Sequence, residues 1–295
     1  MKTGERIRRL RERKQMTQSE LAGECVSRNM LSLIENGRAT PSIQTLEALA
    51  EKLKTTPAFL LADEREEVAL LKQTRISDIR LAFSGKNYRI AADLCRRLYE
   101  EGMDQDDEID LILSESLFET AKEILLSDRV REAARLFDET VFYAMRTVYY
   151  TDHLLSAVWT YFEYMGMLSP SLVSENLDET MVVDVSVAPQ NDLFCRYIPI
   201  LLSDGEQTVT LRAEDPPYAR LMEIHLRVKS HMRAGEFEKA LSELTEILRG
   251  EDILPGILMY HVFSDMEECC YRVGNTRNAE LYRDLKVSQF EKLLS

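Results

Sequence analysis

The apolar residues of the first 61 positions recur at helical spacing in five short runs, the first over positions 4–14. Each run starts at a residue that suits the beginning of a helix: Thr3, Thr17, Ser27, Ser42 or Pro57. The pattern therefore predicts a compact bundle of five short α-helices.

Very few residues separate the second of these helices from the third. Thr17 and Glu20 form a capping box at the start of the second helix. The positions expected to face inward from this helix and the following turn are Leu21, Cys25 and Val26. Two helices joined so closely must cross steeply.

The third helix is expected to begin after Ser27 as its N-cap and to end at Asn36-Gly37, which favours a left-handed stop. Helical spacing predicts that its buried side consists of Met30, Leu31 and Ile34. A helix, a tight turn and a second helix of this kind place the start of the second helix in the major groove of DNA.

A set of short motifs stands in a fixed order along these positions: Gly4-Glu5-Arg6-Ile7, Leu10-Arg11, Thr17-Gln18, Glu20-Leu21-Ala22, Leu31-Ser32-Leu33-Ile34-Glu35-Asn36-Gly37, Pro41-Ser42 and Leu46 to Leu53. Together they resemble the Xre/Cro-type helix-turn-helix regulators of bacteria and phages. The resemblance implies a five-helix DNA-binding domain over residues 1–62 and double-stranded DNA as its partner. The turn, with only Cys25-Val26, is one residue shorter than is usual there. The shorter form is similar to that of the peptide-sensing regulators of the Rgg, NprR and PlcR type, which carry a helical-repeat domain. The order and size of the parts resemble the Rgg/Rap/NprR/PlcR group.

Six residues are candidates for contact with DNA. At the start of the third helix, Arg28 is expected to pair with guanine, Asn29 with adenine, and Ser32 with either base. Ser27, the N-cap of this helix, is included in the set. Gln18 matches the family glutamine that braces a phosphate, and Arg38 is expected to contact the backbone on the other flank. The alternative for Arg28 and Asn29 is an exposed, solvated helix start. Leu33 is expected either to touch a thymine methyl or to be half-buried, and Glu35 to hold the bundle together by hydrogen bonds.

From position 63 onward a short signature recurs within a helical pattern. Gly235-Glu-Phe237-Glu-Lys-Ala240 has the Gly-x-aromatic-x-x-Ala spacing of a tetratricopeptide repeat, and weaker copies end at Ala91, Ala133 and Ala279. The glycine lets the chain turn, the aromatic residue fills the wedge between helices, and the alanine permits close packing. Residues 63–295 are therefore expected to form a tetratricopeptide-like solenoid, with helices at 66–84, 88–101, 107–126, 130–149, 152–167, 218–234, 237–249, 256–273 and 277–293.

The stretch 169–217 breaks this pattern. Residues 182–187 and 208–211 are β-branched and partly alternating, and the apolar segment 193–202 lies between them. The stretch predicts either a small β-hairpin-like insertion on an otherwise all-α fold or an irregular pair of helices.

Charge is divided between the two parts. Residues 1–62 contain 11 Lys and Arg against 7 Glu, a net charge of +4. Since the net charge of the whole chain is −14, the remaining residues carry a net charge of −18. The basic residues 1–62 suit contact with the phosphate backbone of DNA, which would repel the acidic residues 63–295. The alternative for the acidic part is that its charge serves solubility.

Neither catalysis nor metal binding is expected. The five cysteines and four histidines lack metal spacing, and no phosphate loop, Gly-x-Ser-x-Gly or His-Glu-x-x-His motif occurs. No cofactor is implied. No segment approaches the ~18 consecutive apolar residues of a membrane span, and the first residues lack a secretory apolar run, so a cytoplasmic protein is expected.

The repeats suggest two functions. In the first, a concave groove binds a short peptide, with candidate residues Tyr143, Arg146, Tyr150 and Trp159 within an aromatic run that also includes Tyr149, Tyr161 and Tyr164. The alternative for each aromatic residue is the core. In the second, the repeats dock a protein partner and bind no small effector. A head without a DNA role is a third hypothesis. Because one head spans only a few base pairs, a homodimer held by the repeats is expected.

Overall fold

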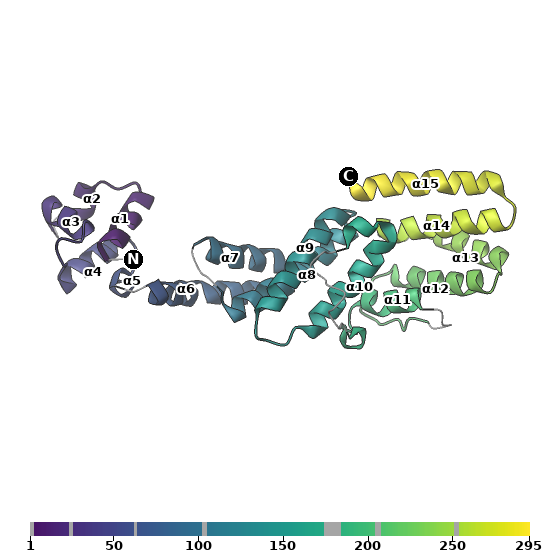
Figure 1. Ribbon diagram of the computed structural model, residues 1–295, viewed down its shortest axis with the longest axis horizontal. Helices are drawn as coiled ribbons and strands as arrows, with labels where there is room; N and C mark the ends of the chain where they lie inside the picture. Colours follow the sequence, from purple (N-terminus) through teal and green to yellow (C-terminus); the bar gives the residue numbers. More distant parts are fainter. Residues whose placement is uncertain are drawn as a thin grey trace. The chain divides into compact units, whose positions relative to one another are not determined.

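The computed structural model describes residues 3–23, 26–61, 64–101, 105–173, 184–203, 208–250 and 254–295. These residues contain fifteen α-helices and two short 3-10 turns, and no β-strand among them (Figure 1). They belong to two compact units, Met1–Leu81 with Arg97–Asp104 and Ala82–Arg96 with Gln105–Ser295. None of the helices in the described ranges is long and apolar enough to cross a membrane.

The first unit begins with the five short helices that the sequence predicts. They are α1 (Thr3–Arg13), α2 (Gln18–Ala22), α3 (Arg28–Glu35), α4 (Ile43–Lys52) and α5 (Pro57–Leu61) (Figure 1). The predicted caps are formed: Thr17 and Glu20 make a reciprocal capping box, and the hydroxyls of Ser27 and Ser42 accept backbone N–H groups of α3 and α4. Local sequence therefore defines where these helices begin.

A single apolar core joins the five helices. Its fully buried members include Ile7, Leu21, Leu31, Ile34, Leu46, Leu49 and Leu60. The prediction that Met30 is buried is wrong, because 44% of that residue is exposed. Leu31 and Ile34 already fill the buried stripe of α3, and a neighbouring residue on a helix is rotated by ~100° away from it. Val26 is partly buried against the core, and Cys25 lies outside the described residues.

A glycine lets α1 approach α3 closely. A Cβ atom at Gly4 would lie 1.9 Å from the carbonyl oxygen of Ile34, far inside van der Waals contact. Because the obstructing atom belongs to the backbone, no rotamer change can relieve the overlap. Gly4 therefore fixes the spacing between α1 and α3.

The helices that follow correspond to the predicted repeats. They are α6 (Glu64–Ser84), α7 (Tyr88–Glu100), α8 (Asp107–Leu126), α9 (Val130–Arg146), α10 (Asp152–Leu168), α12 (Ala219–Arg233), α13 (Phe237–Arg249), α14 (Gly256–Arg272) and α15 (Thr276–Leu294). The end predicted for α9 at residue 149 is wrong by three residues. The chain turns into an extended conformation at Thr147, whose hydroxyl donates to the carbonyl of Asp107.

The repeat signature acts as its physics requires. Ala133 and Ala240 are 0% exposed, so each permits close contact between the helices of a pair. Gly235 precedes α13 with a φ of 77°, a left-handed conformation that glycine adopts without strain. The predicted antiparallel pairs α8–α9, α12–α13 and α14–α15 pack against each other.

The segment 169–217 contains no strand in its described part, so the β-hairpin expectation is wrong there. It forms two 3-10 turns, η1 (Pro170–Leu172) and η2 (Val185–Val187), and α11 (Leu193–Leu202). Asp192 caps α11 by accepting the N–H groups of Phe194 and Cys195. This cap favours a helical conformation for the apolar run that follows it. Residues 208–211 have no regular structure, and 174–183 lie outside the described residues.

Residues far apart in the sequence meet within the second unit. The Asp128 carboxylate, between α8 and α9, accepts the backbone N–H of Gly256 at 2.7 Å at the start of α14. Helix α15 also packs against α9. The helix pairs α8–α9 and α14–α15 are therefore in contact.

Candidate nucleic-acid interface

The start of α3 presents polar side chains to solvent. Arg28 and Asn29 are exposed, and Ser32 is half-buried one turn later. The Ser27 hydroxyl accepts the N–H of Met30 at 3.2 Å, which satisfies one free N–H of this helix end. Leu33 is 42% exposed on the same helix. The predicted base-contacting residues thus lie together on an accessible helix tip.

Glu35 anchors the other end of α3 to α1 and α2. Arg11 donates to its carboxylate through Nε at 2.7 Å and Nη2 at 3.1 Å, and Gln18 donates through Nε2 at 2.8 Å. Glu35 is 4% exposed. The hydrogen bond with Glu35 raises the pKa of Arg11. The expected structural role of Glu35 is confirmed, and the Gln18 amide retains a second N–H for a phosphate oxygen.

Two basic residues of this bundle serve its structure. Arg6, on the first helix, is 1% exposed and donates to the carbonyl of Leu60 at 3.1 Å. Lys52 donates to the carbonyl of Leu21 at 3.1 Å, at the end of α2. The bundle therefore has fewer cations available for DNA than its net charge suggests, whereas Arg38 is exposed after α3.

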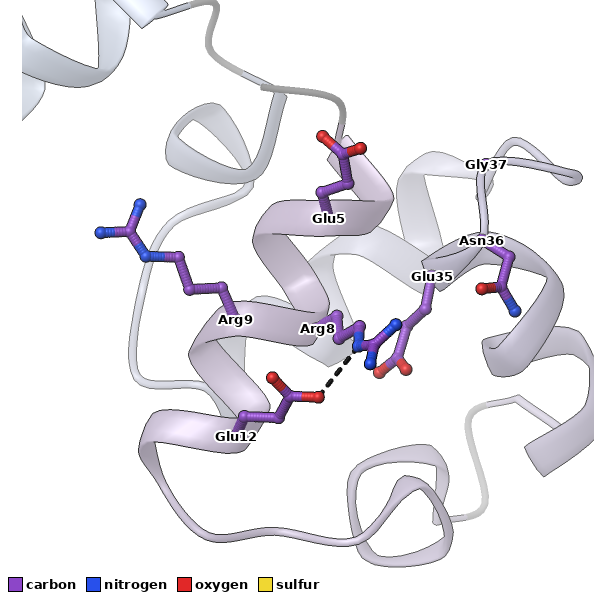
Figure 2. A pocket seen from close by; sticks show the side chains of 7 residues that line it. All are labelled: Glu5, Arg8, Arg9, Glu12, Glu35, Asn36 and Gly37. Atoms are coloured by element: carbon purple, nitrogen blue, oxygen red, sulfur yellow. Dashed lines mark hydrogen bonds and ion pairs between the residues drawn. The ribbon is translucent and has the colours of Figure 1, made fainter.

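A pocket with a volume of about 340 Å³ lies where α1 faces the end of α3, and Figure 2 shows the side chains that line it. It is lined by Glu5, Arg8, Arg9, Glu12, Glu35, Asn36 and Gly37. Arg8 Nε lies 2.9 Å from the Glu12 carboxylate, and Glu35 is occupied by Arg11. Because its charges are largely paired within the bundle, this pocket is not an open cradle for an anion.

Comparison with known families decides what this bundle is. Residues 7–60 match the family model described as helix-turn-helix. Residues 7–60 are a helix-turn-helix domain. The match covers α1 from Ile7 onward, all of α2, α3 and α4, and most of α5. The helix-turn-helix domain is a DNA-binding module, which agrees with the exposed tip of α3.

Solved structures of similar proteins include three regulator chains. One is PlcR of Bacillus thuringiensis in complex with the peptide PapR7 and DNA, at 11% identity and a TM-score of 0.23, covering 100% of this chain and 99% of that one. The others are the competence regulator ComR of Streptococcus vestibularis, without ligand (16%, TM-score 0.20, covering 97% and 91%) and with its signalling peptide XIP (16%, 0.21, covering 97% and 97%). No curated protein sequence matches the chain.

The residues behind the helix-turn-helix domain that we predicted to contact a peptide fall into two groups. Tyr143 is half-buried, and the Arg146 guanidinium lies 5.5 Å from its ring centroid. Tyr150 is 66% exposed, whereas Trp159 packs partly buried against the core. The remaining predicted residues divide in the same way: Tyr149 is 51% exposed, but Tyr161 and Tyr164 are 2% and 0% exposed and belong to the core.

A pocket that the sequence did not predict lies within the second unit. It has a volume of about 260 Å³ and is lined by Tyr88, Glu115, Phe118, Glu119, Lys122, His153, Leu154, Pro189, Asn191 and Asp192. Burial alone would lower the pKa of Lys122, but the charges of Asp192 and Glu119 raise it. The only sequence signal is the series Glu115, Glu119 and Lys122, which share one face of a mainly apolar helix.

Proposed function

We propose that the chain is a sequence-specific, DNA-binding transcription regulator whose α3 tip reads the major groove. The observation that carries this proposal is the exposure of Arg28 and Asn29 at the capped start of α3 within the helix-turn-helix domain. Ser32 lies one turn further along and completes the base-contacting set, while Ser27 holds the tip in place. Gln18 and Arg38 are the proposed phosphate contacts on the two flanks.

Substitutions at Arg28 and Arg38 test the proposal. A preferred duplex is first selected from random DNA with the full chain, and binding is then measured at several salt concentrations. Arg28→Ala is expected to reduce discrimination at one base position by ~1–3 kcal/mol. Arg38→Ala is expected to weaken all duplexes alike and to reduce the salt slope by about one unit. Binding without sequence preference or salt dependence would exclude the proposed function.

For the repeats we propose a sensing role, in which Tyr143, Arg146, Tyr150 and Trp159 contact a short peptide. The partial exposure of Tyr143 and the exposure of Tyr150 support this proposal, since rigid amphipathic rings suit peptide recognition. The Arg146 guanidinium lies 5.2 Å and 5.5 Å from the ring centroids of Phe142 and Tyr143, and its Nε lies 3.3 Å from the buried Asp110 carboxylate, so it is already oriented.

Docking of a folded protein is the second candidate. It is favoured by large apolar residues that are exposed around the end of α9: Phe142 at 51%, Met145 at 57% and Val148 at 81%. Large apolar residues exposed together on a surface are typical of protein interaction sites. Saturable binding of a peptide to one chain supports sensing, whereas binding of folded partners alone supports docking.

We further propose that two chains act together on inverted half-sites, held by the repeat region. One α3 tip spans only a few base pairs, so a two-fold dimer is needed to reach operator specificity. Sedimentation equilibrium of the full chain, free and with selected DNA, is expected to give twice the chain mass of 34.1 kDa as the protein component. A monomer in both states would refute the dimer.

A further inference from the structure

The pocket beside α8 has the size of a recess for one chemical group. Its volume of about 260 Å³ is below the ~300–1,000 Å³ of pockets that enclose whole small ligands. Its walls come from the start of α7, one face of α8, the start of α10 and the residues before α11. The recess therefore suits the end of a ligand whose remainder lies outside.

A buried ion pair forms a fixed part of this recess. Lys122 Nζ lies 2.7 Å from the Asp192 carboxylate and 3.0 Å from Glu119. The Asp192 side chain is only 5% exposed. It also accepts the Tyr161 hydroxyl at 3.1 Å and the Phe194 N–H at 3.0 Å. With its lone pairs occupied from several elements, Asp192 holds Lys122 in one position.

Glu115 is left without an equivalent partner. Its nearest cation-forming group is His153 Nε2 at 3.8 Å, beyond hydrogen-bond distance. Lys122 is already shared by Asp192 and Glu119. Burial raises the pKa of Glu115, as expected for a carboxylate that has lost water without gaining a full counter-charge. Three carboxylates thus face one ammonium group and one imidazole across the recess.

The other walls suit the stem of a cationic side chain. Phe118, Leu154 and Pro189 provide apolar surface, and Tyr88 and Phe118 provide aromatic rings. Long cationic side chains pack their methylene groups on such surfaces and place the charge near carboxylates or rings. A carboxylate or phosphate ligand would be repelled by the acidic majority.

We propose that this recess binds the ammonium or guanidinium group of the peptide effector, with Glu115 as its principal counter-charge. The proposal rests on the peptide-sensing function proposed above. It connects to that site through Tyr150, whose ring is stacked on His153 with centroids 6.3 Å apart. The effector is accordingly a peptide with a basic side chain or a free amino terminus, not an acidic one.

Synthetic heptapeptide mixtures test this inference with the full chain immobilised. Three mixtures are acetylated and amidated and carry Lys, Arg or Gln at the central position, with all other positions randomised. A fourth has central Gln and a free amino terminus. Each is applied to the unaltered chain, to Glu115→Gln and to Glu123→Gln, which changes an exposed carboxylate of the same helix outside the recess. Far-ultraviolet circular dichroism and urea unfolding of the full chain confirm that the second unit of each variant is folded.

At least one cationic mixture is expected to be retained about tenfold more than the acetylated Gln mixture, the ratio expected of one charge-assisted hydrogen bond. The preference is expected to persist in Glu123→Gln and to fall below about twofold in Glu115→Gln. Preference for the Lys and Arg mixtures identifies a side chain, and preference for the fourth mixture identifies the amino terminus. Equal retention of all mixtures, or an unchanged preference in Glu115→Gln, would overturn this inference and leave peptide sensing standing. Retention of no mixture would overturn both.

Discussion

Glu35 illustrates how a buried charge is tolerated at the residue scale. Its carboxylate is nearly inaccessible, yet it accepts hydrogen bonds from Arg11 and Gln18 of two other helices. A buried ion pair adds little stability over an apolar contact, but removal of one partner strands the other. Glu35 therefore matters through what its loss would leave behind.

Glu35→Ala is expected to lower the free energy of unfolding of the helix-turn-helix domain by about 3 kcal/mol, because the largely buried Arg11 loses its counter-charge. Urea titration of the full chain, analysed at the transition in which the helix-turn-helix domain unfolds, measures the effect. Glu12→Ala is the control, since the Glu12 carboxylate is exposed and its ion pairs with Arg8 at 2.9 Å and Arg11 at 3.6 Å are screened by solvent, so a much smaller loss is expected. Similar losses in the two variants would contradict the argument.

Sequence alone was informative about residues whose role is local. The capping residues Thr17, Ser27 and Ser42 behave as predicted because a cap depends on neighbours within four positions. The burial of Arg6 could not be predicted, since its acceptor is the carbonyl of Leu60, 54 positions away. Met30 was misassigned because helical spacing alone does not define the width of the buried stripe.

At the scale of elements, the contact between α1 and α3 is the tightest constraint described. It depends on the absence of a side chain at Gly4, where backbone meets backbone. Since α3 carries the proposed DNA-contacting residues, its position on α1 determines where those residues point. A change at the contact between α1 and α3 is therefore expected to alter the proposed DNA interface without being part of it.

Gly4→Ala is expected to destabilise the domain by about 3 kcal/mol, the upper part of the range for overpacking, and to weaken binding of the selected duplex. Thermal unfolding and DNA titration measure the two effects. Gly37→Ala is the matched control: that glycine has a φ of 71° but nothing within 4 Å of a Cβ. Only the ~1 kcal/mol of a left-handed alanine is expected there. Equal stability of the two variants would argue against the backbone overlap.

Apart from the end of α9, helix boundaries outside the insertion were predictable to within two residues because the apolar period and the predicted turns agree. Segment 193–202 was harder to assign, since a short apolar run suits a buried strand as well as a helix. Its outcome depended on Asp192, which caps α11 and also binds Lys122 and Tyr161. Only the tertiary structure brings those partners together.

At the scale of the whole repeat unit, a polar network crosses the interior between α11, α12 and α14. His225 lies 2.6 Å from the Tyr197 hydroxyl through Nδ1 and 2.8 Å from Asp265 through Nε2, and Lys229 also binds Asp265. Burial raises the pKa of Asp265, but these hydrogen bonds and charges lower it to about 2. Nearby, burial lowers the pKa of His261 to about 3.

His261 is therefore expected to make the repeat unit sensitive to acid. Its pKa in the folded chain is below the unfolded value of about 6.5. Between these two values the unfolded chain binds a proton at this histidine, and the folded chain does not. Stability is full above about pH 6.5 and declines as the pH falls, by about 2 kcal/mol between pH 7 and pH 5. Urea unfolding at these two pH values measures the loss. His261→Phe, which keeps a ring beside Tyr164, is expected to reduce it; an unchanged loss would show that other groups cause it.

The acidic recess beside α8 could not be predicted from the sequence. Its lining residues run from Tyr88 to Asp192 and come from four separate segments. In the sequence, Glu115, Glu119 and Lys122 have the pattern of any solvated helix face, because nothing local indicates that neighbouring elements enclose them.

The bond between Asp128 and Gly256 changes what kind of repeat protein this is. Open arrays tolerate gain or loss of terminal units, because each unit touches only its neighbours. Here the contact ties the pair α14–α15 to the turn between α8 and α9, so removal of the last two helices would uncover α9 and loosen a joint more than a hundred positions upstream. The pairs α8–α9 and α14–α15 are therefore not independent units that the protein could gain or lose one at a time.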